Sequence, residues 1–201
     1  ELSQSCKLVN TLLARGDTSE KTEKAINLAL NEDIPNAVDF IVSSTTKMDA
    51  LLSGLLDICR LTTTTTTTQS IDMNALVSNA AASMEYQINQ AGAKVKIEAL
   101  PVCIGNSSEI TRVFSNLLSN ALKFLDPARP GEIWISGQTV DHQSIYCVED
   151  NGIGIAAEHQ EKIFEIFYRL DPDKKKGDGI GLTIVKRIME KHNGKVWVES
   201  E

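Results

Sequence analysis

Two asparagines and a lysine are spaced to share one face of a helix in the middle of the chain. Asn116, Asn120 and Lys123 follow one another at steps of four and three residues, which is helical spacing. Asparagine oxygens are suitable ligands for Mg²⁺, and a lysine supplies a mobile positive charge for a phosphate. A solvated surface helix would carry the same polar residues. The neighbouring Phe114 and Leu118 favour the functional interpretation, because they leave this face as the only polar side of an otherwise buried helix.

An aspartate and two glycines follow an apolar stretch that reads as a strand. Asp150, Gly152 and Gly154 come directly after residues 144–148. A carboxylate at a strand end can accept a hydrogen bond from an exocyclic amino group such as that of adenine, and we expect it to be buried, where a lost bond is costly. The glycines allow a tight turn and a close approach to a planar ligand. An ordinary Asn-Gly turn is the alternative.

A second glycine-rich segment precedes a predicted helix over residues 181–191. Gly177, Gly179 and Gly181 lie just before Leu182, and closely spaced glycines before a helix offer backbone N–H groups to phosphates. The segment lacks the Gly-Lys-Ser/Thr ending of a Walker loop. Residues 171–176 are strongly charged and could form a lid, although a solvated loop has the same composition. Arg169 stands beside them, where its planar fork could reach a terminal phosphate.

The elements around these residues predict an α+β sandwich. Asp72 is a candidate N-cap for a helix over residues 73–91, and another helix spans residues 107–125. Alternating apolar residues predict strands at 94–98, 132–136, 144–148 and 195–199. This order suits a mixed sheet with helices on one face. The aromatic residues within 163–167 are expected to be core or hinge residues.

The first part of the chain predicts a helical hairpin. Residues 1–15 form one expected helix and residues 36–60 the second, with a break at residues 16–19 and Pro35 in or just before the first turn of the second helix. The second helix has a heptad seam at Ile41, Thr45, Met48, Leu52, Leu55 and Cys59. Two helices cannot close a core, so we predict a homodimer with a four-helix bundle. A hairpin folded onto its own C-terminal domain is the alternative.

The composition of the chain argues against some classes of protein. The net charge of −7 argues against a nucleic-acid binder, and no apolar run is long enough for a membrane span or membrane contact. The four cysteines are far apart and are expected to be buried, which fits a reducing cytoplasm.

Residues 62–68 are all threonines. Their low complexity favours a linker between domains, and an artefactual stretch of sequence is the alternative.

Taken together, these motifs resemble the catalytic core of sensor histidine kinases. Residues 116–124 match the N box, residues 150–154 the first glycine box, residues 163–169 the F box and residues 177–182 the second glycine box. Residues 36–61 are similar to the second helix of the dimerisation and phosphotransfer hairpin. The likeness is greatest to kinases of the phytochrome type, and it implies a hairpin at 1–61, a linker at 62–70 and a C-terminally truncated ATP-binding domain of the histidine kinase/Hsp90 type at 71–201.

The resemblance also implies roles for individual residues. ATP would contact Asn116, Asn120, Lys123, Asp150, Gly152, Gly154, Arg169, Gly177, Gly179, Gly181 and Leu182. Asp150 would bind adenine, Asn116 and Asn120 would hold Mg²⁺, and Lys123 and Arg169 would serve catalysis at the phosphates. The γ-phosphoryl group would pass to a histidine and then to an aspartate in the receiver domain of a response regulator.

The phosphoacceptor departs from the family pattern. The chain contains only His142, His159 and His192, and none lies in the predicted hairpin. An acceptor would stand immediately before Glu1, which would then be the carboxylate assisting its deprotonation; a terminal Glu with no such role is equally compatible. We therefore expect this fragment to bind ATP without phosphorylating itself, and a nucleotide-binding pseudokinase stays open as an alternative to a kinase.

Overall fold

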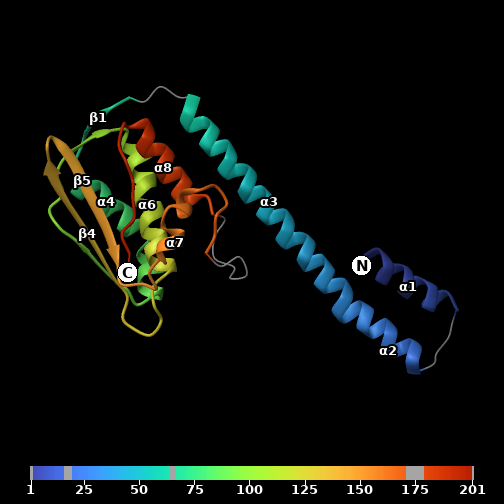
Figure 1. The fold of residues 1–201 in the computed structure, drawn as a ribbon. Coiled ribbons are helices and arrows are strands. Elements are labelled where there is room, and N and C mark those ends of the chain that lie inside the picture. Colours follow the sequence, from blue (N-terminus) through green and yellow to red (C-terminus); the bar gives the residue numbers. More distant parts are fainter. Residues whose placement is uncertain (1, 16–19, 64–66, 171–178, 201) are drawn as a thin grey trace. The chain divides into compact units, whose positions relative to one another are not determined.

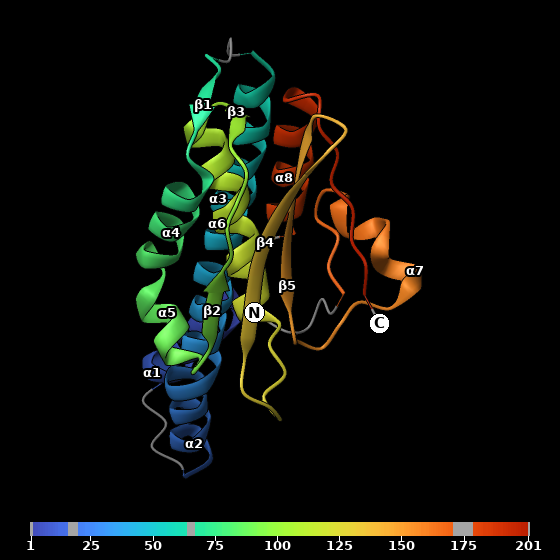
Figure 2. The same cartoon turned by 90° about the vertical axis from the view of Figure 1, so that its left-hand side faces the viewer.

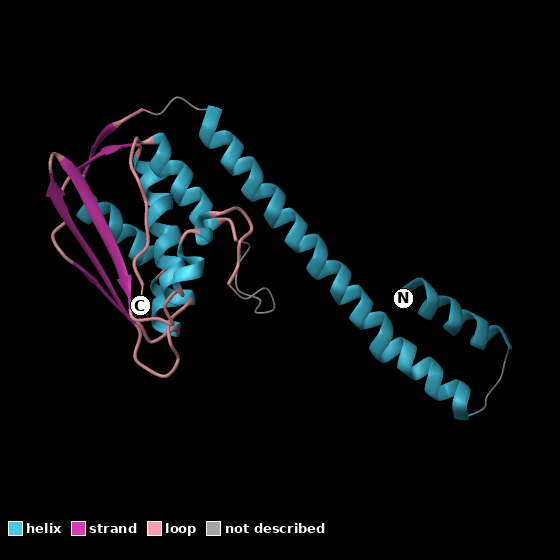
Figure 3. Cartoon of the chain, viewed as in Figure 1, coloured by secondary structure: helices cyan, strands magenta, loops and turns pink. Residues whose placement is uncertain are grey.

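The computed structural model describes residues 2–15, 20–63, 67–170 and 179–200. The chain divides into two units, Glu1–Ser53 and Gly54–Glu201. The first unit is helical throughout its described residues, and the second combines helices with strands (Figure 3). The boundary between the units lies inside the helix that covers Ile34–Thr63, ahead of the linker expected at residues 62–70.

The N-terminal part of the chain contains more helix than its sequence pattern predicts. Helix α1 covers Leu2–Arg15, as expected, and α2 covers Glu20–Leu28. A π-helical turn, η1, at Ala29–Asp33 joins α2 to α3, which covers Ile34–Thr63. Helix α2 and the turn were not predicted, and the predicted break at residues 16–19 lies outside the described residues. The first two threonines of the low-complexity run belong to α3.

The π-helical turn explains how a helix continues through Pro35. Proline has no N–H and its ring clashes with the carbonyl four residues earlier. The backbone N–H of Ile34 instead reaches the carbonyl of Ala29, five residues back, which widens the turn just before the proline. Pro35 therefore lies in the first turn of α3, as expected, but the helical path begins upstream of it.

The C-terminal unit is built on a three-stranded mixed sheet. Its strands are β2 (Lys94–Ile97), β4 (Glu132–Val140) and β5 (Gln143–Asp150), in the order β2-β4-β5. Strand β2 is parallel to β4, and β4 is antiparallel to β5, so the three lie side by side in Figure 2. A separate antiparallel pair joins β1 (Gln69–Ile71) to β3 (Cys103–Gly105), which the sequence pattern did not predict.

Three helices cover one face of this sheet. They are α4 (Met73–Ser83), α6 (Ser107–Lys123) and α8 (Gly181–Lys191), and all lie on the same side of β4 and β5 (Figure 1). Smaller elements complete the unit: α5 (Glu85–Gln90), α7 (Ala157–Gln160) and the 3-10 turn η2 (Lys162–Phe164).

Alternation along β4 and helical spacing along α6 and α8 bury one face of each element. Ile133 and Ile135 of β4 have no exposed surface, whereas Trp134 between them is half-buried, as expected for successive residues on opposite faces of a strand. Leu118 of α6 and Ile188 of α8 are also fully buried. The predicted α+β fold with helices on one face is confirmed.

Two local expectations were wrong. Residues 195–199 form no strand (Figure 3); the tail is held instead by Ser200, whose Oγ accepts from Ile155 N at 2.8 Å and whose carbonyl accepts from Gln160 Nε2 at 3.1 Å. The predicted helix over 73–91 is interrupted at Met84, where φ is −109°.

Burial was also predicted incorrectly for the cysteines whose side chains are described, which do not include Cys59. Cys6 and Cys147 are exposed, and Cys103 is half-buried. Cys147 lies opposite Ser136 in the register of β4 and β5. Successive side chains of a strand point to opposite faces, and the neighbouring Val148 faces inward, so the Cys147 side chain points to the other face of the sheet.

None of the helices in the described part of the chain combines the length and the apolar character that crossing a membrane requires.

The cap of α4 provides a test of local folding. The Asp72 carboxylate accepts from Ala75 N at 3.1 Å, so Asp72→Ala should lower the free energy of unfolding by about 1 kcal/mol. Both tryptophans, Trp134 and Trp197, belong to the C-terminal unit, so denaturant unfolding followed by their fluorescence reports on it. Asp72→Asn, which keeps the cap, is the control. An unchanged unfolding midpoint in Asp72→Ala would contradict the assignment.

Candidate functional site

On the face of α6 that carries the two asparagines, a hydrogen bond fixes the orientation of the Asn116 side-chain amide. Asn116 Nδ2 donates to the carbonyl of Arg112 at 2.9 Å. Because a carbonyl can only accept, this bond fixes which end of the amide is nitrogen. A Cβ placed on Gly181 would lie 3.1 Å from Asn116 Oδ1, so the oxygen faces the start of α8. Asn120 and Lys123 are half-buried on the same helix, and their helical spacing places all three residues on one face.

The end of α6 meets the first glycine turn at van der Waals distance. Ile153 N donates to the carbonyl of Phe124 at 3.0 Å. A Cβ on Gly152 would overlap that same carbonyl oxygen. Gly152 is buried, and only a residue without a side chain permits this approach. The following Gly154 has φ of 71°, a conformation that glycine adopts readily.

Asp150 is the last residue of β5 and lies next to this turn. Its Oδ1 accepts from Gly152 N at 2.9 Å, so the turn orients the carboxylate. The residue is exposed, which corrects the expectation of a buried carboxylate. It is accessible because β5 ends at this position, at the rim of the sheet.

The aromatic segment meets the second glycine segment through the backbone. Phe167 N donates to the carbonyl of Gly179 at 2.9 Å, and both residues have positive φ, 65° and 71°. Thr183 Oγ1 on α8 donates to the carbonyl of Phe164 at 3.2 Å. Ile163 is buried, whereas Phe167 is 46% exposed, so of the expected core or hinge residues Ile163 lies in the core and Phe167 does not. Arg169 is half-buried.

Helices α6 and α8 are also joined at their opposite ends, which the sequence did not predict. Lys191 Nζ lies 2.8 Å from Glu109 Oε1, and both side chains are largely buried. His192 Nε2 accepts from Asn106 N at 3.0 Å, and its Nδ1 lies 2.8 Å from the carbonyl of Ile188. These bonds require a neutral ring with the proton on Nδ1. No sequence pattern links residues 82 and 86 positions apart, so this junction was not foreseeable.

Family and structure comparisons agree with this arrangement. Residues 105–201 match the family described as histidine kinase-, DNA gyrase B-, and HSP90-like ATPase. The phytochrome-like protein Cph1 of Synechocystis sp. (strain ATCC 27184 / PCC 6803 / Kazusa) is 34% identical over 86% of this chain and 23% of its own length. The nucleotide-free catalytic domain of histidine kinase ThkA is 26% identical, with a TM-score of 0.57 over 66% of this chain and 88% of that chain.

The chain belongs to the sensor histidine kinases. It spans less than a quarter of the length of the curated phytochrome-like relatives that it matches. ThkA in complex with the response regulator protein TrrA matches 100% of this chain and 55% of that chain with a TM-score of 0.62, and at 20% identity it supports the fold alone.

The predicted motifs therefore meet in pairs, two of which involve α6 or its C-cap. Asn116 faces Gly181, the Phe124 carbonyl contacts Gly152 and Ile153, and Phe167 contacts Gly179. Leu182 is half-buried in the first turn of α8. Glu1 and Gly177 lie outside the described residues.

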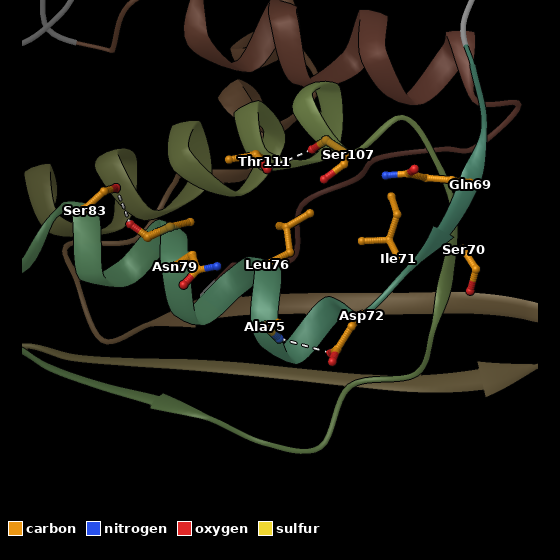
Figure 4. A pocket seen from close by; sticks show the side chains of 11 residues that line it. Gln69, Ser70, Ile71, Asp72, Ala75, Leu76, Asn79, Ser83, Ser107 and Thr111 are labelled. Atoms are coloured by element: carbon orange, nitrogen blue, oxygen red, sulfur yellow. Dashed lines mark hydrogen bonds between the residues drawn. The ribbon is translucent and has the colours of Figure 1, made fainter.

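A separate hollow of about 420 Å³ is lined by residues from the start of α6 and from the segments before it (Figure 4). It is bounded by β1, α4 and the first turns of α6, and its lining includes Leu76, Asn79 and Thr111. None of the predicted site residues lines it. The Thr111 hydroxyl donates to the carbonyl of Ser107, and the Ser83 hydroxyl to the carbonyl of Ala80, so these hydroxyl protons are used within their own helices.

An aromatic contact fixes α6 against β5 in the C-terminal unit. Phe114 and Tyr146 make an edge-to-face pair with ring centroids 5.9 Å apart. The Tyr146 hydroxyl donates to the carbonyl of Pro101 at 2.8 Å. Burial raises the pKa of Tyr146 to about 12, so the hydroxyl keeps its proton throughout the physiological range. The contact holds together the two elements that carry Asn116 and Asp150.

The contact between Gly152 and Phe124 predicts an unusually severe glycine substitution. In Gly152→Ala the new methyl group would meet backbone atoms that cannot rotate away, so the loss of stability should exceed that of a glycine with open surroundings. Gly92→Ala is the matched control, since its φ is 60° but no atom lies within 4 Å of the added Cβ; it should cost about 1 kcal/mol. Equal unfolding midpoints for the two variants would contradict the contact.

Proposed function

We propose that this chain binds ATP with Mg²⁺ and transfers the γ-phosphoryl group to a histidine. The observation that supports the proposal is that the four motifs meet in pairs: Asn116 with Gly181, Phe124 with Gly152, and Phe167 with Gly179. Membership of the sensor histidine kinases supports the same assignment.

The Asp150 carboxylate is proposed to hold the purine. It stands at the exposed end of β5, and its orientation is set by Gly152 N. A carboxylate only accepts hydrogen bonds, so it favours adenine, which offers an amino group, over a base that offers a carbonyl at the same position. Gly152 and Gly154 let the backbone lie close to the ring.

The donor set around α6 fits a magnesium ion bound together with phosphates. Asn116 Oδ1 is presented toward Gly181, and Asn120 follows one turn later. Mg²⁺ is usually bound by a few protein oxygens together with substrate phosphates and water. Within the described residues no group of three His, Cys, Asp or Glu side chains could hold a metal ion instead. When bound, the ion would neutralise charge on the triphosphate.

Catalysis would then depend on positioning and charge neutralisation. Lys123, the last residue of α6, is proposed to contact the phosphates, and Arg169 to face the γ-phosphate. Gly179, Gly181 and the start of α8 would supply backbone N–H groups to the phosphates. None of the chain's three histidines lies in α1 to α3, so we assign no phosphoacceptor within these helices.

The partner of the phosphorylated histidine is proposed to be a receiver domain. The support is the related ThkA, whose structure was determined with the response regulator protein TrrA. The receiver aspartate would accept the phosphoryl group.

A nucleotide-binding experiment tests the proposal. A non-hydrolysable ATP analogue with Mg²⁺, titrated calorimetrically into Asp150→Asn, should bind about tenfold more weakly than to the wild type, because the charged acceptor is replaced by a neutral amide that also presents an NH₂ donor. Asp141→Asn, at the exposed β4–β5 turn, should bind as the wild type does. Equal affinities for Asp150→Asn and wild type, or a wild type that prefers the guanine analogue, would reject the adenine assignment.

A homodimer through the N-terminal helices is proposed from the surface of α3. Its heptad positions Ile41, Met48 and Leu52 are 47%, 62% and 60% exposed in a single chain. A row of large apolar side chains at this spacing is costly in water and is buried when helices pair.

The dimer is tested by sedimentation equilibrium. Leu52→Glu should shift the protein toward the monomer, because a charge would have to be buried in the seam. Ser53→Glu is the matched control: it adds the same charge one position away, off the seam, and should leave the mass unchanged. A monomeric wild type, or an Leu52→Glu variant with wild-type mass, would rule out this interface.

A further inference from the structure

The loop between α6 and β4 is attached to the first glycine turn at several points. Asn151 bonds with both of its amide atoms: Oδ1 accepts from Glu132 N at 2.8 Å, and Nδ2 donates to the carbonyl of Pro130 at 2.8 Å. Arg129, in the same loop, donates from Nη2 to the carbonyl of Gly152 at 2.8 Å. The loop therefore contacts the turn that orients Asp150.

One peptide group of the turn is held at both ends. The carbonyl of Gly152 accepts from Arg129, and the N–H of the same peptide group, on Ile153, donates to the carbonyl of Phe124 at 3.0 Å. A peptide unit is planar, so fixing both its oxygen and its nitrogen fixes its orientation. The preceding N–H, on Gly152, then points to Asp150 Oδ1.

Arg129 is itself oriented by the loop. Its Nε lies 3.3 Å from Asp126 Oδ2, and Asp126 Oδ1 accepts from Ala128 N at 2.9 Å. The Arg129 side chain is 53% exposed, so the ion pair by itself adds little stability. Its effect is to keep the guanidinium directed at the Gly152 carbonyl.

We propose that Arg129 is a positioning residue for purine recognition: it fixes the first glycine turn and, through Gly152, the Asp150 carboxylate that selects adenine. This inference rests on the proposed function. Arg129 does not touch the phosphates in this scheme, and its contribution is to the geometry and base preference of the site.

The test compares the binding of adenine and guanine nucleotides. In the full 201-residue chain, Arg129→Ala should weaken binding of a non-hydrolysable ATP analogue by about three- to tenfold, the range expected for one charge-assisted hydrogen bond at a half-exposed site. Its preference for the adenine over the guanine analogue should shrink, because a loosened carboxylate discriminates less well. A purely structural role would lower the unfolding midpoint and leave this preference unchanged.

Three further variants separate the possible causes. Arg187→Ala is the matched control, since Arg187 is 54% exposed and pairs with Glu190 at the same i,i+3 spacing; it should leave affinity and base preference unchanged. Arg129→Lys should fall between the wild type and Arg129→Ala, because it keeps the charge and loses the planar fork. Asp126→Ala combined with Arg129→Ala should be no weaker than Arg129→Ala alone, as expected for residues that act through one contact.

The outcomes distinguish this inference from the proposed function. Wild-type affinity and base preference in Arg129→Ala would overturn the role of Arg129 while leaving the nucleotide site in place. A wild type that bound neither analogue would overturn the proposed function, and the role of Arg129 with it. In the absence of nucleotide, the amide resonances of Gly152 and Ile153 should shift in Arg129→Ala and stay in place in Arg187→Ala. Unchanged resonances in Arg129→Ala would contradict the contact between Arg129 and the Gly152 carbonyl.

Discussion

The close approach of Gly152 to the carbonyl of Phe124 is the contact on which the candidate site depends. It brings the end of α6 to the end of β5, and these two ends carry Lys123 and Asp150. A side chain at Gly152 would push them apart. The hydrogen bond from Ile153 N to the same carbonyl makes the approach specific in register as well as distance. A packed interior alone would bring the elements together without fixing which atoms meet.

Helix α8 is held to α6 at both of its ends. At one end Asn116 faces Gly181, and at the other Glu109, Lys191 and His192 connect the start of α6 to the end of α8. The buried Val113 of α6 and the fully buried Val185 and Ile188 of α8 lie between the two junctions. Because protein interiors are densely packed, a helix anchored in this way resists sliding. The polar residues at the first end are thereby presented at fixed positions, which is what phosphate and metal binding need.

The fold was largely predictable because its signals are local. The alternation along β4, the Asp72 cap and the apolar stripe of α6 each depend on neighbouring residues, and each was confirmed. The exceptions have physical causes. Residues 195–199 have strand composition, but the tail is fixed by the Ser200 bonds and forms no ladder. Helix α3 is preceded by a π-helical turn, whose five-residue bond has no compositional signature.

By itself, the sequence determined which residue types could bind a nucleotide and, through helical spacing, that Asn116, Asn120 and Lys123 share a face. Only the tertiary structure decided that this face meets Gly181, that Asp150 is exposed, and that Arg129 and His192 reach groups far away in the chain. Periodicity depends on short-range geometry and can be read along the chain. The partner of a side chain such as Arg129 depends on how whole elements pack, and that is set by the sum of contacts across the molecule.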